Sequence, residues 1–273
     1  MSPARPLEVV VAATTEDTPE DDAERFYGST LAVRPSAGTR LAVNFVSTID
    51  GVVALGADAA DVTVSGGSVE DRTLMALLRS EADVIVVGAG TLRSLPRHRW
   101  TPGFVSPDDA ALWRQHRTRV RGDASPAPLI VVSANAAVPP RHPAIATPDG
   151  DVVVLTRLGA EVSGLPAHVR IVQMEGSGTL QGLAVRSWIE ENLSPRFILC
   201  EGGPHLFGSL LADGSVDELF LTVAPRIAGR RNDSRSALVQ GWAAPPRELT
   251  EMTLLSARRA ADTLFLRYRV DTV

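Results

Sequence analysis

The sequence contains a single cysteine, Cys200, among its 273 residues. One thiol excludes an internal disulfide and a zinc site built from several cysteines, and no metal centre is expected. Because Cys200 ends an apolar run that starts at Phe197, we interpret it as a buried structural thiol. The lack of disulfides fits a cytoplasmic protein.

The chain also lacks long apolar runs and an excess of basic residues. No run approaches the roughly 18 apolar residues that a membrane-spanning helix needs, and the first 19 residues show no basic start followed by an apolar block. The net charge of -5 disfavours nucleic acid or an anionic membrane as the main partner. We therefore expect a small-molecule partner, no nucleic acid and no membrane.

No internal repeat and no linker-like change of composition divides the chain. We expect an N-terminal arm over residues 1–40 and a single domain over residues 41–273. The apolar patterns predict an α/β fold of about eight strands and four main helices, with Ser68 as the N-cap of a helix over residues 69–80. Most strands have the pattern of buried parallel strands, whereas residues 263–270 alternate as an edge or antiparallel strand does.

The stretch from Phe197 to Leu211 carries the main functional signal. It begins as an apolar strand, breaks at Gly202-Gly203 and resumes at helical spacing, with Pro204 near the first helical position. Such a turn leaves backbone N–H groups free at the positive end of a helix, and no side chain keeps a phosphate away. The pattern predicts a pyrophosphate cradle, and the alternative is an ordinary tight turn.

A second glycine turn, from Gly88 to Thr91, follows the apolar run of residues 82–87. Arg93 stands where a Rossmann fingerprint has its third glycine, so the usual dehydrogenase fold is disfavoured. The basic residues beyond this turn either receive a phosphate or belong to a solvated loop: Arg93, Arg97, His98 and Arg99.

A carboxylate follows the predicted strand of residues 41–46. Asp50 precedes Gly51 where this strand ends, and the carboxyl ends of strands open into the mouth of an α/β sheet. A carboxylate at that place points into the mouth of the sheet. The alternative is a turn in which Asp50 caps backbone N–H groups.

Taken together, these pieces resemble the pyrimidine reductases of riboflavin biosynthesis, which share the dihydrofolate reductase-like fold. Four motifs follow the family's order between Leu41 and the C-terminus: residues 43–51, 65–79, 84–93 and 200–229. The resemblance implies a three-layer α/β/α architecture with a mixed, mostly parallel sheet and a C-terminal antiparallel strand. It also implies a homodimer.

The resemblance further implies an NADPH-dependent reductase, which delivers hydride to C1′ of a ring-opened ribosylaminopyrimidine phosphate and yields the ribitylamino form. Positions that match the family's cofactor contacts are Val46, Ser65, Gly88, Gly90, Thr91, Ser133, Gly202, Gly203, Pro204, His205, Leu206 and Phe207. Positions that match its substrate contacts are Thr63, Arg79 and Glu201, with Asp50 as the catalytic candidate. The guanidinium of Arg79 suits a phosphate as a bidentate donor.

The sequence departs from the family beyond Thr91. In a gapless comparison, Leu95 stands where the family carries an acidic cofactor contact, and Pro102 stands where it carries a substrate arginine. Arg97 and Arg99 are therefore candidates to replace that arginine. The zinc deaminase to which the family is often fused needs a Pro-Cys-x-x-Cys motif, which a single cysteine excludes here.

Two other functions are compatible with the same residues. A dihydrofolate reductase-like enzyme would use Asp50 beside a pterin or folate substrate. A non-catalytic dinucleotide-binding protein would keep the glycine turns and lack the substrate arginines.

Overall fold

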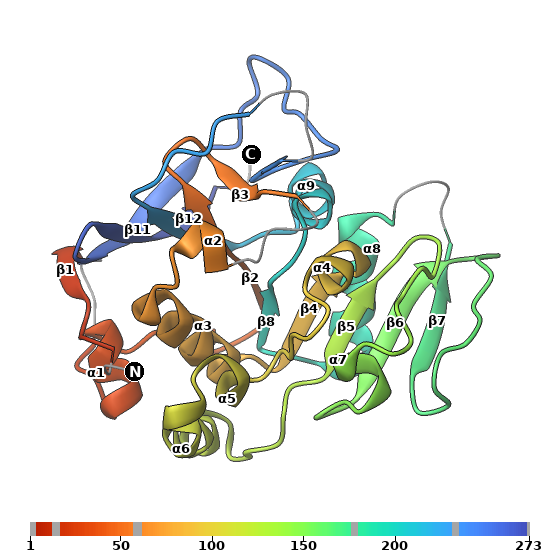
Figure 1. Ribbon diagram of the computed structural model, residues 1–273, viewed down its shortest axis with the longest axis horizontal. Coiled ribbons are helices and arrows are strands. Elements are labelled where there is room, and N and C mark those ends of the chain that lie inside the picture. Colours follow the sequence, from red (N-terminus) through yellow and green to blue (C-terminus); the bar gives the residue numbers. More distant parts are fainter. Residues whose placement is uncertain (1–3, 13–16, 57–61, 176–179, 231–234, 272–273) are drawn as a thin grey trace.

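The computed structural model describes residues 4–12, 17–56, 62–175, 180–230 and 235–271 (Figure 1). Ten strands of these residues form one sheet. In spatial order they are β1 (Glu8–Val11), β11 (Met252–Ala260), β12 (Thr263–Val270), β9 (Glu218–Ala224), β2 (Arg40–Thr48), β8 (Phe197–Cys200), β4 (Val84–Gly88), β5 (Leu129–Val132), β6 (Val152–Arg157) and β7 (Arg170–Met174). Neighbours from β9 to β7 are parallel, and the three pairs from β1 to β9 are antiparallel.

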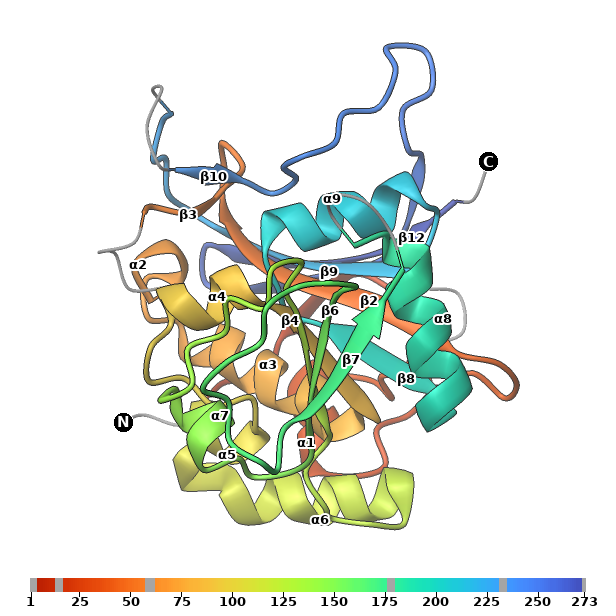
Figure 2. The same ribbon diagram turned by 90° about the vertical axis from the view of Figure 1, so that its right-hand side faces the viewer.

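Helices cover both faces of this sheet. One face carries α1 (Asp22–Tyr27), α3 (Val69–Glu81), α5 (Pro102–Val105), α6 (Ala110–Arg121) and α7 (Pro143–Ala146), and the other carries α8 (Gly182–Leu193) and α9 (Pro204–Ala212) (Figures 1 and 2). Shorter elements complete the chain: β3 (Val52–Ala54), α2 (Val62–Ser65), α4 (Ala89–Ser94), the 3₁₀ turn Pro107–Asp109 and β10 (Ser236–Ala237), which pairs with β3. The predicted three-layer, mostly parallel α/β architecture is confirmed.

The central strands are apolar on both faces because both faces are covered. In β8, Phe197 and Leu199 pack into the core beneath α3, whereas Ile198 and Cys200 pack into the core beneath α9. Burial raises the pKa of the Cys200 thiol to about 12, so Cys200 is an inert structural residue, as its place in the sequence predicts.

The N-terminal residues differ most from expectation. Strand β1 pairs with β11 at the edge of the sheet, which brings the strand number to ten instead of about eight. Phe26, Tyr27 and Leu31 are buried in the core. The described part of residues 1–40 is therefore built into the sheet and the core, and it does not project from them as an arm.

The C-terminal strand β12 is antiparallel, as its alternation predicts, but it is not an edge strand. It pairs with β9 on one side and with β11 on the other. Within the described residues, no helix is both long and apolar enough to cross a membrane.

Helix α3 is fixed at both ends. Ser68 is its N-cap, as predicted, because its hydroxyl accepts a hydrogen bond from the backbone N–H of Asp71 at 3.1 Å. At the other end, the buried guanidinium of Arg117 donates to the carbonyls of Ser80 and Ala82, where a cation also complements the helix dipole.

His116 on α6 connects the N-terminal residues to α3. Its Nδ1 lies 2.7 Å from the carboxylate of Asp21, and its Nε2 lies 3.0 Å from that of Glu81. Burial alone would lower the pKa of His116, but hydrogen bonds and charge from Glu81 and Asp21 outweigh burial and raise it. The ring is therefore held as an imidazolium between two carboxylates.

We predict that this contact stabilises the protein at mildly acidic pH and weakens as the pH rises. A folded-state pKa above the unfolded value gives a contribution that is complete below about pH 6.5 and is lost as the pH passes through the raised pKa. Denaturant unfolding of the wild type and His116→Gln at pH 6 and pH 9 measures it. The stability difference between the two proteins should shrink at pH 9, and an equal difference at both values would contradict the prediction.

Candidate functional site

The candidate site lies where strand β8 stops short of its neighbour β2. Strand β8 pairs with β2 only along residues 40–43, whereas β2 pairs with β9 as far as Thr48. Among the described strands, none pairs with residues 44–46 on the side of β8. This gap is at the carboxyl end of the parallel strands and at a reversal of strand order, where open α/β sheets usually bind ligands.

A cavity of about 130 Å³ occupies the gap. Its apolar walls come from β2, β3, α3 and the loop after α4: Phe45, Val46, Val53, Met75, Leu95 and Trp100. Its polar groups come from the same elements and from the end of β8: Asn44, Asp71, Arg79, His98 and Glu201. Apolar walls with a few converging polar groups are typical of a small-molecule site.

Two predicted substrate residues, Arg79 and Glu201, meet at the cavity as a buried ion pair. The Nε and Nη2 of Arg79 donate to the two carboxylate oxygens of Glu201 at 2.8 and 2.6 Å. The remaining N–H groups go to the carbonyls of Arg99 and Thr101 and to Nε2 of His98. A guanidinium has five N–H donors, and these five hydrogen bonds use all of them within the protein.

This bonding changes the interpretation of Arg79. With every N–H donated to a protein atom, its guanidinium has no donor left for a substrate phosphate. Arg79 instead joins α3 to Glu201 and to the loop that carries His98. Arg79 lies at the cavity, and its bonding leaves no N–H donor for the bidentate phosphate contact that the resemblance implies.

His98 is a polar residue of the cavity that the sequence marked only as part of a basic cluster. Its ring lies 4.9 Å from the Trp100 ring and 4.8 Å from the Phe104 ring, measured between centroids. Burial, together with the charge of Arg79, lowers the pKa of His98 to about 2. The ring is therefore neutral at physiological pH.

The two glycine turns lie against each other beside this cavity. Gly202 directly follows Glu201, and its carbonyl accepts the Gly88 N–H at 3.3 Å. A Cβ at Gly202 would lie 3.0 Å from the Val87 backbone, and Gly203 has a φ of +80°, which side chains rarely adopt. Gly202 thus suits the close approach of the two turns, Gly203 suits its positive φ, and the Thr91 hydroxyl lies beside both.

Helix α9 presents few free donors at this turn. Pro204 has no N–H, and the Phe207 N–H donates to the Gly203 carbonyl at 3.0 Å. The Phe207 ring packs on Phe45, 5.5 Å between centroids. The hydrogen bond to Gly203 makes the Phe207 N–H unavailable to a ligand. In the first turn of α9, the N–H groups that remain for a ligand are those of His205 and Leu206.

Asp50 has the bonding of a turn cap. It accepts hydrogen bonds from the Thr48 hydroxyl at 2.6 Å and from the backbone N–H groups of Ala228 and Gly229 at 3.1 and 2.7 Å. The bond from Thr48 and those from the two backbone groups lower the pKa of Asp50 to about 2. An acid this strong is a carboxylate at neutral pH and a poor proton relay, which favours the structural alternative.

The other predicted residues lie around the cavity and the two glycine turns. Ser133 is buried just after β5, which is next to β4, and its hydroxyl lies 3.4 Å from the Asn135 side chain. Arg93 on α4 donates to the Ala137 carbonyl at 2.7 Å, so its guanidinium reaches the same loop. Gly90 is on α4 near this guanidinium.

Thr63 and Ser65 are on α2, near the end of β9, where Arg226 approaches the Thr63 carbonyl and Gly66. Neither residue lines the described cavity.

The two arginines proposed to replace the family's substrate arginine do not line the described cavity. Arg97 is exposed. Arg99 donates to Asp149 and to Thr147, each at 2.8 Å, and its guanidinium thereby anchors the loop after α4.

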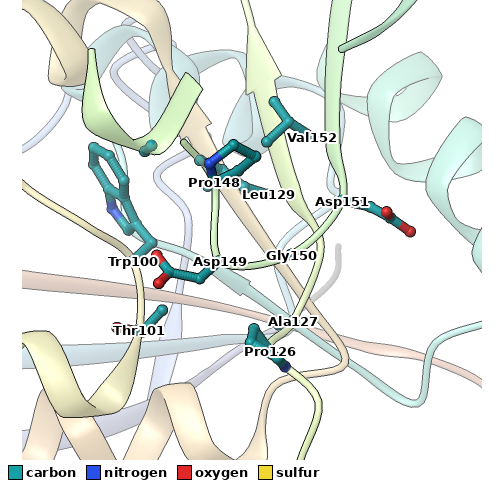
Figure 3. A pocket seen from close by; sticks show the side chains of 11 residues that line it. Trp100, Thr101, Pro126, Ala127, Leu129, Pro148, Asp149, Gly150, Asp151 and Val152 are labelled. Atoms are coloured by element: carbon teal, nitrogen blue, oxygen red, sulfur yellow. The ribbon is translucent and has the colours of Figure 1, made fainter. Parts of the chain in front are cut away.

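A second pocket lies at the opposite edge of the sheet, near the starts of β5 and β6 (Figure 3). Trp100 and Asp149 are among its lining residues, and the side chain of Asp151 points away from it. Its volume is about 20 Å³, enough for a single water molecule. We therefore assign the site to the larger cavity and the glycine turns beside it.

Comparison with known proteins identifies the family. Residues 39–264 match the family model of the RibD C-terminal domain. The chain belongs to the RibD C-terminal domain family. No curated protein matched the chain.

Solved structures of several other proteins share the fold. A pyrimidine reductase-like protein from Corynebacterium diphtheriae is 21% identical, with a TM-score of 0.63 over 86% of this chain and 93% of that one. Riboflavin biosynthesis reductase Rib7 from Saccharomyces cerevisiae is 13% identical, with a TM-score of 0.56 over 88% and 91%.

The Thermotoga maritima diaminohydroxyphosphoribosylaminopyrimidine deaminase/5-amino-6-(5-phosphoribosylamino)uracil reductase is 14% identical, with a TM-score of 0.62 over 85% of this chain and 57% of that protein. These neighbours confirm the predicted fold, and the family-model match confirms the family that the resemblance predicted.

We predict that Gly203→Val abolishes binding of the expected dinucleotide and leaves the fold intact. The valine would have to adopt a φ of +80° and would fill the turn beside Thr91. Gly122→Val is the matched control, because Gly122 has a φ of +75° at the end of α6 and no atom lies within 4 Å of an added Cβ. Fluorescence titration with NADPH and circular dichroism measure the two effects. Unchanged affinity in a folded Gly203→Val protein would refute the cradle.

Proposed function

We propose that this protein is an NADPH-dependent reductase that converts a ribosylaminopyrimidine 5′-phosphate to its ribitylamino form. The observation that carries the proposal is the junction at Glu201. This residue lines the cavity, and the next two residues form the glycine turn at the start of α9. A dinucleotide held at the turn would have its reactive end directed to a substrate in the cavity.

The residues at the turn fit a dinucleotide. Gly202 and Gly203 place no side chain between the turn and a ligand, and the N–H groups of His205 and Leu206 at the start of α9 suit a pyrophosphate. The backbone of Val46 in the gap of β2 is suited to contact a nicotinamide. When bound, NADPH supplies the hydride. The protein's task is to hold the pyrimidine in the cavity and to exclude water from it.

We propose that Asp50 positions the loop at residues 228–229 and does not pass a proton. Its three hydrogen bonds and its low pKa both support this role.

A homodimer remains a proposal supported by the family resemblance, and so does a cytoplasmic location. Because β12 lies inside the sheet, that strand is not available to pair with a second copy. Sedimentation velocity at micromolar concentration tests the dimer, and a monomer would contradict it.

The test of function is NADPH oxidation, followed by absorbance, with three substrate conditions in parallel. We expect oxidation with the ribosylaminopyrimidine phosphate and none with dihydrofolate or without substrate. Oxidation with dihydrofolate would favour a folate-type reductase instead. Binding of NADPH without turnover on either substrate would favour a non-catalytic dinucleotide-binding protein.

We predict that Asp50→Asn lowers kcat by less than about 10²-fold, which is the smallest loss usually expected when a general acid or base is removed. Asn keeps one acceptor oxygen for the turn and loses the charge. The measurement is kcat together with the NADPH dissociation constant of both proteins. A loss of about 10²-fold or more in kcat, with cofactor affinity unchanged, would return Asp50 to a catalytic role.

We also predict that Arg93 contributes to a preference for NADPH over NADH. Its guanidinium reaches the loop after Ser133, where the adenosine end is expected, and a cation there suits a 2′-phosphate. Arg93→Gln should weaken NADPH binding about tenfold and leave NADH binding unchanged. Arg114→Gln, on the exposed side of α6, is the control. Equal losses for both cofactors would count against this role.

A further inference from the structure

The cavity offers no free cation among the residues that the structure describes. Arg79 is the single positively charged residue of its described lining, and its N–H groups are all donated to protein atoms. The lining also contains the carboxylates of Asp71 and Glu201. These residues suit a neutral ligand rich in N–H groups, and they disfavour a phosphate in the cavity itself.

The contact between Arg79 and His98 fixes the position of the imidazole proton. Nη2 of Arg79 lies 2.8 Å from Nε2 of His98. A guanidinium nitrogen only donates, so Nε2 must accept and carries no proton. The proton of a neutral ring is therefore on Nδ1.

The Nδ1–H group is available to a ligand. Nδ1 has no hydrogen-bond partner among the described residues. It is also not among their fully buried polar atoms that lack a partner, so it is accessible from outside the protein interior. Contacts with Trp100 and Phe104 hold the ring in place, and His98 lines the cavity. The protein thus presents one oriented donor at this wall.

Glu201 supplies acceptors in the same cavity. Each of its carboxylate oxygens accepts one hydrogen bond from Arg79 and retains a further lone pair. A wall with a donor and an acceptor matches a heterocycle that has a ring carbonyl next to a ring N–H, as a pyrimidinedione has.

We propose that His98 is a specificity-determining residue of this cavity, whose Nδ1–H donates to a ring carbonyl of the bound heterocycle while Glu201 accepts from ring N–H groups. The proposal rests on the proposed function, since the heterocycle is the pyrimidine of the substrate. It places the substrate phosphate outside the described cavity. It also assigns Arg79 as a positioning residue that acts through His98 and Glu201.

Two substitutions of His98 separate its two nitrogens. The amide oxygen and nitrogen of Gln are as many bonds from the backbone as the histidine Nε2. His98→Gln therefore retains an acceptor for Arg79 and loses the Nδ1 donor. The amide oxygen and nitrogen of Asn are as many bonds from the backbone as Nδ1. His98→Asn therefore retains a donor at that position and loses the acceptor for Arg79. His168→Gln is the matched control, because His168 is an exposed histidine that does not line the cavity.

The probes are 5,6-diaminouracil, which has ring carbonyls, and 2,4,5,6-tetraaminopyrimidine, which has none. Calorimetric titration should show that the wild type prefers diaminouracil. His98→Gln should lose about tenfold in affinity for diaminouracil and little for the tetraamino probe, the scale of one hydrogen bond. His98→Asn and His168→Gln should keep the preference. Nitrogen NMR of the wild type should show the proton on Nδ1 between pH 5 and pH 8.

Unchanged diaminouracil affinity in His98→Gln, equal losses for both probes, or a proton on Nε2 would each overturn the proposal. Its failure is distinguishable from failure of the reductase function. Turnover of the wild type with NADPH, combined with probe binding that is insensitive to His98→Gln, would refute only the role of His98. Absence of turnover, with the predicted loss of probe affinity, would refute only the reductase.

Discussion

The ion pair between Arg79 and Glu201 is the interaction on which the site depends. Both side chains are almost fully buried, at 1% and 6% exposure, so each charge has lost most of its hydration. Two buried charges are tolerated only if their hydrogen bonds are complete, and removal of one partner leaves the other uncompensated. Here the guanidinium satisfies a carboxylate, two carbonyls and an imidazole together. A change at any one of these groups therefore disturbs the others.

The fold brings these groups together by simple means. Helix α3 carries Arg79 near its C-terminus, and Arg117 fixes that end through the carbonyls of the last turn. Strand β8 ends at Cys200, which places Glu201 at the gap beside β2 and the glycine turn directly after it. The loop after α4 brings His98 to the same point, and Arg99 anchors that loop to Asp149. Three separate segments thus meet at one guanidinium: helix α3, the residue after β8 and the loop of residues 98–101.

Local sequence patterns predicted the features that local chemistry determines. The strand at Phe197–Cys200, the Ser68 cap and the two glycine turns each follow from periodicity or from backbone requirements within a few residues. Bonding between distant residues could not be predicted in this way. A match to a substrate position places Arg79 at the cavity but does not show that its donors are used. The cap formed by Asp50 likewise depends on residues 228–229, which are far away in the sequence.

The chain's basic residues show why composition is a weak guide to anion binding here. All 27 are arginine, and several are used inside the fold. Arg117 satisfies helix carbonyls, and Arg258 lies over the Tyr27 ring at 3.6 Å and bonds its carbonyl. Such arginines are structural donors whose planar, five-donor groups connect carbonyls and carboxylates. We propose that anion recognition falls to backbone N–H groups of the glycine turn and to the exposed Arg93 at its margin. Within the basic cluster after Thr91, Arg99 is bonded to Thr147 and Asp149, whereas the proposed ligand contact falls to Arg93.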